Sequence, residues 1–299
     1  SEIEGSPYIA FADAEVERVL MANGVSSDGV GITKEDAENV ASIGEWFKNN
    51  TIATSFNEIN YFKNVKTIQA GAFYKATNLV IDDLNLPNLD KIYYGAFNST
   101  KLKKISSLGN VTQFMNAAAG VGGTFQNCGD LTKVSHNVFA NITDLGDSAF
   151  MQCTNLRIDL ILPHLEGVMT SAFSKTPIRR VLDLGKITAF FADTALGWAT
   201  MPFGSEYEVL IIPPSVERIG RYAFAGDGNM KALVVKAINP PTLAASAFSQ
   251  STSTCGVYVP TDSVDSYKEA WASWANRIKP IGDLATDNPT LYAEIQQYL

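Results

Sequence analysis

Hydrophobic positions recur along this chain with a period in the mid-twenties. The marker is a phenylalanine that in most copies follows a small residue and alanine, as in Gly-Ala-Phe at 71–73 and Ser-Ala-Phe at 171–173. The phenylalanines of the series are Phe73, Phe97, Phe125, Phe150, Phe173, Phe224 and Phe248. Their spacings are 24, 28, 25, 23, 51 and 24 residues, and Phe203 divides the longest interval into 30 and 21. Such a period indicates a repeat protein.

Other apolar positions keep the same phase as the phenylalanine. Five residues before it stand Ile68, Ile92, Leu145, Val168, Ile219 and Leu243, although Gly120 and Trp198 break this rule. Five or six residues after it stand Leu79, Leu102, Leu131, Leu156, Ile178, Val209 and Met230. Each unit is too small to bury its apolar side alone, so units must stack. We therefore expect a solenoid of about eight coils whose short strands form a parallel ladder.

The phenylalanine and the alanine before it each have a place in such a coil. A flat ring at one interior position can stack on its equivalents in the neighbouring coils. The alanine must be small because the chain turns sharply beside the wall, and glycine or serine before it suits a turn. The motif therefore predicts an interior column of rings.

The repeated unit reads roughly I-x-x-x-A-F-x-x-C/T-x-L-x-x-I-x-L-P and resembles the BspA-like leucine-rich repeat of bacterial surface proteins. LGDSAFMQCTNLRIDLILP at 145–163 matches it nearly throughout, and the resemblance covers about residues 65–260. It implies an α+β repeat protein, a leucine-rich-repeat solenoid with helical N-terminal and C-terminal caps. Two coils depart from the pattern, at 111–125 and 187–203, where we expect loops or bulges.

The segments before the repeats have the apolar spacing of helices. Thr33 and Asp36 are placed as a capping box at the start of 33–48, with Asp where Glu or Gln is preferred. The segment 12–24 has an apolar face and ends at Gly24. We therefore predict a helical N-terminal cap over 1–60, followed by the solenoid over 61–260.

A helical C-terminal cap and tail are predicted over 261–299, after a last strand at 257–259. One apolar stripe steps by three and four residues through Val264, Tyr267, Trp271, Trp274 and Ile278, and Pro280 ends it. We expect its two tryptophans to pack over the last coil, and the alternative is a sugar-binding platform. Another short helix is expected around 291–298.

Composition and net charge limit the classes of partner that the protein is expected to bind. Hydrophobic residues make up 46% and charged residues 18% of the 299 positions, which is ordinary for a folded protein. The net charge of −8 disfavours nucleic acid and anionic membranes, because both are polyanions. No apolar run of about 18 residues occurs, so we expect no membrane insertion by this segment. The start at Ser1 fits a cytosolic protein that lacks its Met or a trimmed protein whose export signal is gone, and the family resemblance favours the second.

The sequence predicts no catalytic residues, no cofactor and no metal site. The two histidines, His136 and His164, lie on different coils at nonequivalent phases, which argues against a Ser-His-Asp triad. An enzyme would need acid and base groups near the two insertions, where Asp193 and Glu206 are the candidates. Two such residues are too few to favour an enzyme.

Two other groups of potential ligands leave alternatives open. The loop 23–36 resembles a degenerate calcium-binding loop, in which Asp28 and Glu35 are present and two ligands are missing. Cys128 and Cys153 both stand three residues after their phenylalanine and should therefore stack on adjacent coils. Free buried thiols are favoured there over a disulfide.

Basic residues follow the post-phenylalanine apolar position in several coils. Lys104, Lys133 and Arg180 stand two residues after it, and Lys103, Arg157, Arg179 and Lys231 stand one residue after it. Stacked strands would align them as basic columns on an acidic protein. The functional interpretation is a ligand-contact face of Lys104, Lys133 and Arg180 for an anionic glycan or protein patch. The alternative is solubilising charge that protects a flat sheet from aggregation.

The resemblance implies a non-enzymatic adhesion or binding protein that holds a host or bacterial surface protein or glycan on an extended repeat surface. It also implies export to the cell surface, with a lipoprotein anchor as one mode, or to the periplasm. The alternative is a structural stalk of the cell envelope without a ligand of its own. An apolar or aromatic patch would favour binding, whereas a uniformly polar surface would favour a stalk.

Overall fold

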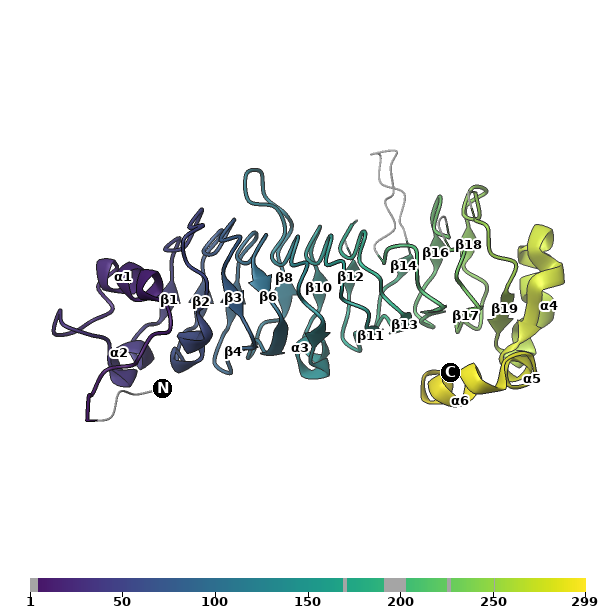
Figure 1. The fold of residues 1–299 in the computed structure, drawn as a ribbon. Coiled ribbons are helices and arrows are strands. Elements are labelled where there is room, and N and C mark those ends of the chain that lie inside the picture. The colour runs from purple at the N-terminus through teal and green to yellow at the C-terminus, as the bar shows by residue number, and fades with distance from the viewer. Residues whose placement is uncertain (1–4, 169–170, 191–202, 225–226, 250) are drawn as a thin grey trace. The chain divides into compact units, whose positions relative to one another are not determined.

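The structure, a computed structural model, describes residues 5–168, 171–190, 203–224, 227–249 and 251–299. The chain divides into two compact units, Ser1–Leu156 and Arg157–Leu299, and each is described by itself. Within each unit, short strands of successive coils pair in parallel, as Figure 1 shows. This pairing confirms the leucine-rich-repeat fold, whereas the count of about eight coils stays a prediction.

The strands of the first unit form parallel ladders along the sides of its coils. One ladder joins β1 (Ser42–Ile43), β2 (Thr67–Ile68) and β5 (Lys91–Ile92). A second joins β3 (Val80–Ile81) and β6 (Lys101–Leu102), and a third joins β4 (Leu84–Asn85), β7 (Lys104–Ser107) and β9 (Lys133–Val134). β8 (Gln113–Phe114) pairs with β10 (Asp144–Leu145). In each ladder the paired apolar residues are buried inside the coil.

The N-terminal helices are shorter than the sequence predicts. α1 (Ala14–Ala22) confirms the helix within 12–24. α2 (Lys34–Glu38) has the predicted capping box, in which Thr33 Oγ1 accepts a hydrogen bond from the Asp36 N–H at 3.0 Å. The helix predicted over 33–48 is wrong beyond Glu38.

Ladder hydrogen bonds explain this difference. The carbonyls of Ala41 and Ile43 accept hydrogen bonds from the N–H groups of Lys66 and Gln69, at 2.8 and 2.9 Å. Strand pairing with the next coil therefore determines the structure of this segment, although its apolar residues are spaced as in a helix. The first paired strand lies inside the segment 1–60, and the boundaries 1–60, 61–260 and 261–299 stay a prediction. The short helices η1 (Asn57–Tyr61) and α3 (His136–Ala140) belong to later coils.

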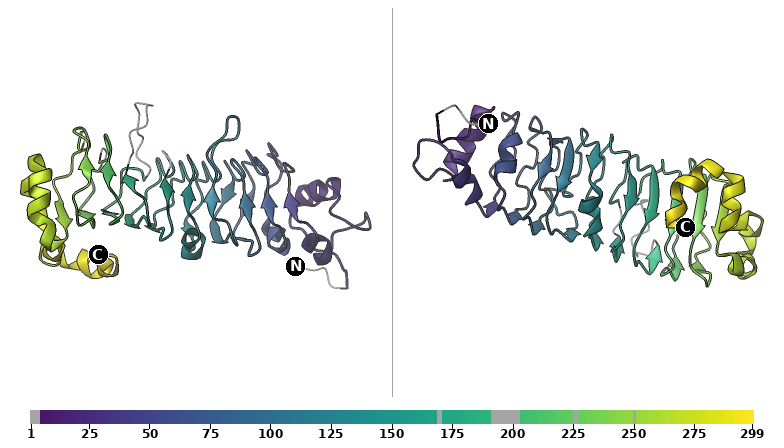
Figure 2. Two further views of the ribbon diagram at one scale, coloured as in Figure 1. Left: turned by 180° about the vertical axis from the view of Figure 1, so that it is seen from behind. Right: turned by 90° about the horizontal axis from the view of Figure 1, so that it is seen from below.

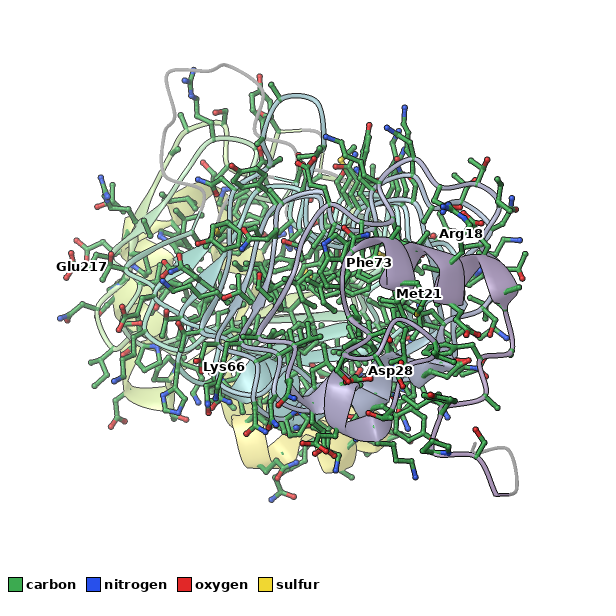
Figure 3. The ribbon with its side chains drawn as sticks, turned by 90° about the vertical axis from the view of Figure 1, so that its left-hand side faces the viewer. Arg18, Met21, Asp28, Lys66, Phe73 and Glu217 are labelled. Carbon is green, nitrogen blue, oxygen red and sulfur yellow. The ribbon has the colours of Figure 1, made fainter. Side chains whose placement is uncertain are left out.

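The phenylalanines of the first unit form the predicted column. Phe47, Phe73, Phe97, Phe125 and Phe150 stack in order, with ring centroids 5.3, 4.8, 5.6 and 5.1 Å apart. Each pair contributes about 0.5–1.5 kcal/mol beyond the burial of its area. Figure 3 shows Phe73 within the coil, whereas Lys66 lies at its outer edge. The column begins at Phe47, which no Ala-Phe motif marks.

The first insertion is a loop, as predicted. After β8 the chain turns back through a bridge between Ala118 and Gly122, and Asn98 Nδ2 donates to the Val121 carbonyl at 2.8 Å. Phe114 takes the core position that Leu145 takes in the next coil, because the two residues are in register. The loop therefore displaces this position from its usual spacing of five residues before the phenylalanine.

The strands of the second unit form two parallel ladders. The six-stranded one contains β11 (Asp159–Ile161), β13 (Arg180–Asp183), β15 (Val209–Ile212), β17 (Ala232–Val235), β19 (Gly256–Val259) and β20 (Ile278–Pro280), in this order. The other contains β14 (Ala189–Phe190), β16 (Arg218–Ile219) and β18 (Thr242–Leu243), and β12 spans Gly167–Val168. Phe190, near the start of the second insertion, is in register with Ile219. Residues 191–202 of that insertion, with its predicted loop, lie outside the described residues.

A tryptophan ends the ring column of the second unit. The Phe224 and Phe248 rings are tilted, with centroids 4.6 Å apart, and the Trp274 ring lies 4.1 Å from Phe248. Trp271 is buried and its Nε1–H donates to the Pro241 carbonyl at 3.0 Å. Both tryptophans therefore pack over the last coil, as predicted.

The C-terminal helical stripe is interrupted in the structure. η2 (Thr261–Ser263), α4 (Val264–Ala270) and η3 (Ala272–Arg277) replace one continuous helix, and Ile278 lies in β20. The prediction of a helical Ile278 and of a last strand at 257–259 is therefore wrong, because β20 pairs with β19. The tail contains η4 (Ile281–Asp283), α5 (Leu284–Asp287), α6 (Pro289–Ile295) and η5 (Gln296–Tyr298), which includes the expected helix.

Candidate binding face

The basic residues named from the sequence lie on the outer side of the strand ladders. In the first unit, Lys104 on β7 is directly in register with Lys133 on β9. Their neighbours Ile105 and Val134 point inward and are buried. Lys101 begins β6 in the same coil as Lys104 and is exposed, as is Lys133. We refer to Lys101, Lys104 and Lys133 as the lysine cluster.

Among the described residues, the lysine cluster has no counter-ion from its own chain. Lys103, beside it, pairs with Asp82 at 3.5 Å between Nζ and Oδ1. Within the described part of the first unit, no carboxylate lies within ion-pair distance of Lys101, Lys104 or Lys133. Equivalent positions of paired strands lie about 4.7–4.9 Å apart, and like charges directly opposite each other repel. A carboxylate, sulfate or phosphate group placed between the ammonium groups would relieve this repulsion.

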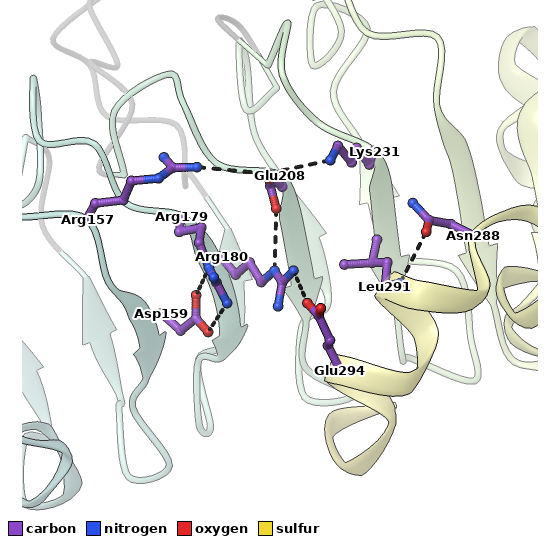
Figure 4. A network of polar contacts seen from close by, with 9 residues as sticks. All are labelled: Arg157, Asp159, Arg179, Arg180, Glu208, Lys231, Asn288, Leu291 and Glu294. Atoms are coloured by element: carbon purple, nitrogen blue, oxygen red, sulfur yellow. Dashed lines mark hydrogen bonds and ion pairs between the residues drawn. The ribbon is translucent and has the colours of Figure 1, made fainter.

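Arg180, the third predicted ligand contact, has a different environment. Its side chain is only 9% exposed, and its guanidinium contacts Glu294 and lies 3.5 Å from Glu208. The Arg180 hydrogen bond holds the pKa of Glu294 below its usual value. Figure 4 shows that Glu294 reaches Arg180 from α6. Arg180 therefore already forms ion pairs with two carboxylates of its own chain.

The other basic residues around Arg180 are also paired. Arg179 donates two hydrogen bonds to Asp159, at 2.9 and 3.1 Å, and these raise the pKa of Arg179. Arg157 and Lys231 lie 3.8 and 3.6 Å from Glu208 (Figure 4). Each of these four cations therefore contacts a carboxylate, in contrast to the lysine cluster of the first unit.

The C-terminal segment 281–299, which we call the C-terminal strap, covers the outer face of the six-stranded sheet (Figure 2). Leu284 of α5 and Leu291 and Ile295 of α6 are buried against the sheet. The sheet contributes six residues to this contact: Leu182, Val209, Ile211, Ala232, Val234 and Tyr258. The packing of the strap on this sheet was not predicted from the sequence. The available signal was that every residue of β15 and β17 is apolar, which is typical of strands buried on both faces.

Polar contacts surround this apolar centre. Asp287 accepts hydrogen bonds from Tyr258 Oη at 2.7 Å and from Lys279 Nζ at 2.8 Å. Lys236 Nζ donates to the Tyr298 carbonyl at 2.9 Å. With the Arg180–Glu294 pair, these contacts fix both helices of the strap on the sheet. This outer face of the second unit is therefore occupied by the chain itself.

The remaining candidate residues do not come together as a site. His136 and His164 are exposed, Glu206 is exposed, and Asp193 lies outside the described residues. Among the residues that the structure describes, no group of three or more His, Cys, Asp or Glu side chains has the geometry of a metal site.

The loop that resembles a calcium site is closed by its own hydrogen bonds. Asp28 accepts from Tyr8 Oη at 2.6 Å and from the Val30 N–H at 2.8 Å. The Tyr8 hydrogen bond is the largest cause that lowers the pKa of Asp28, to about 2. Ser26 in the same loop also donates a hydrogen bond to Asp28. The Asp28 carboxylate thus accepts hydrogen bonds from within its loop and from Tyr8.

The cysteines of adjacent coils are free thiols, as favoured by the sequence. Cys128 and Cys153 are buried, and each Sγ donates to a main-chain carbonyl, of Phe97 and Phe125 respectively, at 3.2 Å. They therefore serve the packing of the coils.

Solved structures of several bacterial proteins are similar to this chain. The leucine-rich cell-surface protein of Faecalibacterium prausnitzii is 16% identical, with 74% of this chain and 83% of that chain covered and a TM-score of 0.27. A leucine-rich repeat protein of Bacteroides ovatus is 16% identical over 81% of this chain and 88% of that chain, with a TM-score of 0.29. Internalin C2 of Listeria monocytogenes is 12% identical over 96% of both chains, with a TM-score of 0.26.

A search of curated proteins found no match. No helix in the described ranges is long and apolar enough to cross a membrane. The model of the BspA-type leucine-rich repeat region matches in six copies, over residues 36–120, 121–193 and 203–280, which is well over half of the sequence. The chain therefore belongs to the BspA-type leucine-rich repeat family.

Proposed function

We propose that this protein is a non-enzymatic binding protein whose first unit holds anionic groups of a surface protein or glycan on the lysine cluster. The observation that carries the proposal is the register of Lys104 and Lys133, two cations that face each other without a carboxylate partner in the described chain. A preformed strand ladder presents these groups with little loss of conformational entropy on binding. Arg180 is no part of this face, because Glu208 and Glu294 contact it.

Family membership supports the setting of this function. A leucine-rich protein with a similar fold is described as a cell-surface protein. We propose that this chain acts in the same setting, exported and held at the cell surface or in the periplasm, as an adhesion protein without catalytic activity.

A charge-reversal pair tests the proposal. The Lys104→Glu/Lys133→Glu variant should lose at least about tenfold in affinity for sulfated or carboxylated glycans, or for acidic matrix proteins, because attraction becomes repulsion. The matched control is Lys66→Glu/Lys91→Glu, which changes the net charge equally at two exposed residues, one directly before β2 and one in β5 of another ladder. Equal losses in both variants would show a general charge effect and would contradict a localised site.

The alternative function, a structural stalk, is favoured by one feature of the second unit. The outer face of its main sheet is covered by the C-terminal strap and is closed to partners. If the wild-type protein binds nothing in a panel of matrix proteins and glycans, the stalk function replaces the proposed one.

A further inference from the structure

A cavity of about 400 Å³ lies in the second unit, between the turns that follow β15 and β17. One wall is the turn 214–217 and the other is the turn 237–241. Its lining residues are Pro214, Ser215, Val216, Glu217, Ala237, Ile238, Asn239, Pro240 and Pro241. Prolines and aliphatic side chains thus provide most of its walls.

The turn 237–241 is held rigidly by the C-terminal cap. Tyr267 Oη donates to the Ala237 carbonyl at 2.6 Å, and Ser263 Oγ donates to the Ile238 carbonyl at 2.7 Å. The third donor is Trp271 Nε1, which bonds the Pro241 carbonyl at 3.0 Å. Two consecutive prolines add backbone stiffness. The shape of this wall is therefore set before any partner arrives.

The rigid turn presents an isoleucine to solvent. Ile238 is 73% exposed, whereas Ala237 before it and Pro241 after it are buried. A large aliphatic side chain on a fixed backbone is costly to leave in water and loses little entropy when a partner covers it. These are properties of an interface anchor.

The cavity has one charged residue. Glu217 is exposed, and within the described residues it has no ion pair and no side-chain hydrogen bond. In Figure 3 its side chain points away from the ribbon. Ser215 is already engaged, since its Oγ donates to the Ile187 carbonyl at 2.6 Å. The complementary group is a cation at the end of an apolar stem.

We propose that this cavity binds an arginine or lysine side chain of a protein partner. The methylene stem packs against Pro214 and Pro240, the cationic group pairs with Glu217, and Ile238 packs against the adjoining residue of the partner. Long basic side chains bury their stems on apolar surface while the charge stays near water. This site is independent of the lysine cluster, because it lies in the other unit and has the opposite charge.

Methyl NMR tests the proposal with N-acetyl-arginine amide as the probe and N-acetyl-citrulline amide as its neutral isostere. The arginine compound should shift the Ile238 Cδ1 and Val216 methyl signals saturably, with a Kd of about 1–10 mM, as expected for a small ligand. The citrulline compound should bind at least about fivefold more weakly, because it lacks the charge.

Two variants test whether the Glu217 carboxylate binds the cationic group of the probe. Glu217→Gln should weaken arginine binding about fivefold, whereas Glu206→Gln, a matched exposed glutamate that does not line the cavity, should leave it unchanged. Equal binding of the arginine and citrulline compounds, or an unaffected Glu217→Gln variant, would overturn the proposal. So would methyl signals that do not move at saturating probe. None of these three results would affect the proposed glycan binding by Lys104 and Lys133.

Discussion

At the scale of single residues, the repeated small-Ala-Phe motif acts mainly through the backbone. The residue before the alanine often has a positive φ, which is +64° at Gly71 and Gly95, +58° at Ser148 and +62° at Ser171. In the same turns, main-chain hydrogen bonds join the coils, for example from the Phe97 N–H to the Thr124 carbonyl at 2.8 Å. Glycine adopts this conformation without strain, so the small residue follows from the turn.

Gly95→Ala is expected to destabilise the protein by about 2–4 kcal/mol. The alanine would keep a φ of +64°, and its Cβ would lie 2.5 Å from Val121 Cβ and too close to the Val121 carbonyl. The control is Gly24→Ala, which has a φ of +74° but no atom within 4 Å of the new Cβ. It should cost only about 1 kcal/mol. Urea unfolding measures both, and equal costs would mean that the close approach of the loop is unimportant.

The buried thiols give a second prediction at this scale. Burial raises the pKa of Cys128 to about 12 and raises that of Cys153 as well, so neither forms the reactive thiolate near neutral pH. Cys255 is partly exposed. Iodoacetamide at pH 8 should therefore alkylate Cys255 alone in the native protein and all three cysteines in denaturant. Rapid native alkylation of Cys128 would contradict this packing, and intact-protein mass spectrometry counts the adducts.

At the scale of elements, the C-terminal strap combines an apolar centre with carboxylate contacts at its edges. Leu284, Leu291 and Ile295 supply the centre, and Asp287 and Glu294 supply the edge contacts. The sequence predicted a helix in this segment but not the sheet surface that the strap covers. Local periodicity does not identify the surface against which a helix packs. Only the wholly apolar strands β15 and β17 indicate that a cover exists.

The strap should open more readily in acid. Hydrogen bonds with Lys279 and Tyr258 lower the pKa of Asp287, and the hydrogen bond with Arg180 lowers that of Glu294. A depressed folded pKa means that the stabilisation is present above the unfolded pKa and disappears as the pH falls through the folded pKa. Protection of strap amides against hydrogen exchange should therefore decrease below about pH 4.

The Asp287→Asn/Glu294→Gln variant is the test of this mechanism. Its strap should be less protected than the wild-type strap at pH 7, and its opening should depend little on pH between pH 3 and 7. Buried amides of β2 and β5, in the first unit, provide the internal reference. An opening free energy of the wild-type strap that is constant over this range would rule out the two carboxylates as its anchors.

At the scale of the whole molecule, the repeat could be predicted because three positions of each coil keep phase. The sequence-based predictions fail where a second apolar pattern, or an insertion, competes with the spacing of the repeat. Residues 33–48 satisfy a helical spacing, yet Ile43 and Phe47 belong to a coil. Phe114 and Phe190 escaped recognition because the insertions separate them from Phe125 and Phe203. For the candidate site, register predicted the Lys104–Lys133 pair. Glu294, by contrast, reaches Arg180 from a distant segment that no spacing rule connects to it.

The net charge of −8 leads to a last prediction, about the association rate of a polyanionic glycan with the lysine cluster. At 0.01 M salt the Debye length is about 30 Å, so the ligand experiences the repulsion of the whole acidic molecule. At 0.15 M it is about 8 Å, and the nearby Lys101, Lys104 and Lys133 dominate. Adding salt should therefore first raise the association rate and then lower it, as the local attraction is screened as well.

Stopped-flow measurements between about 0.01 and 0.5 M salt would show this maximum in the wild-type protein. The Lys104→Glu/Lys133→Glu variant should lack it, because no local attraction remains once distant repulsion is screened. A wild-type rate that falls continuously from the lowest salt would mean that the cluster outweighs the net charge at every distance. The acidic composition would then have no part in selecting ligands, and the lysine cluster alone would determine which polyanions bind.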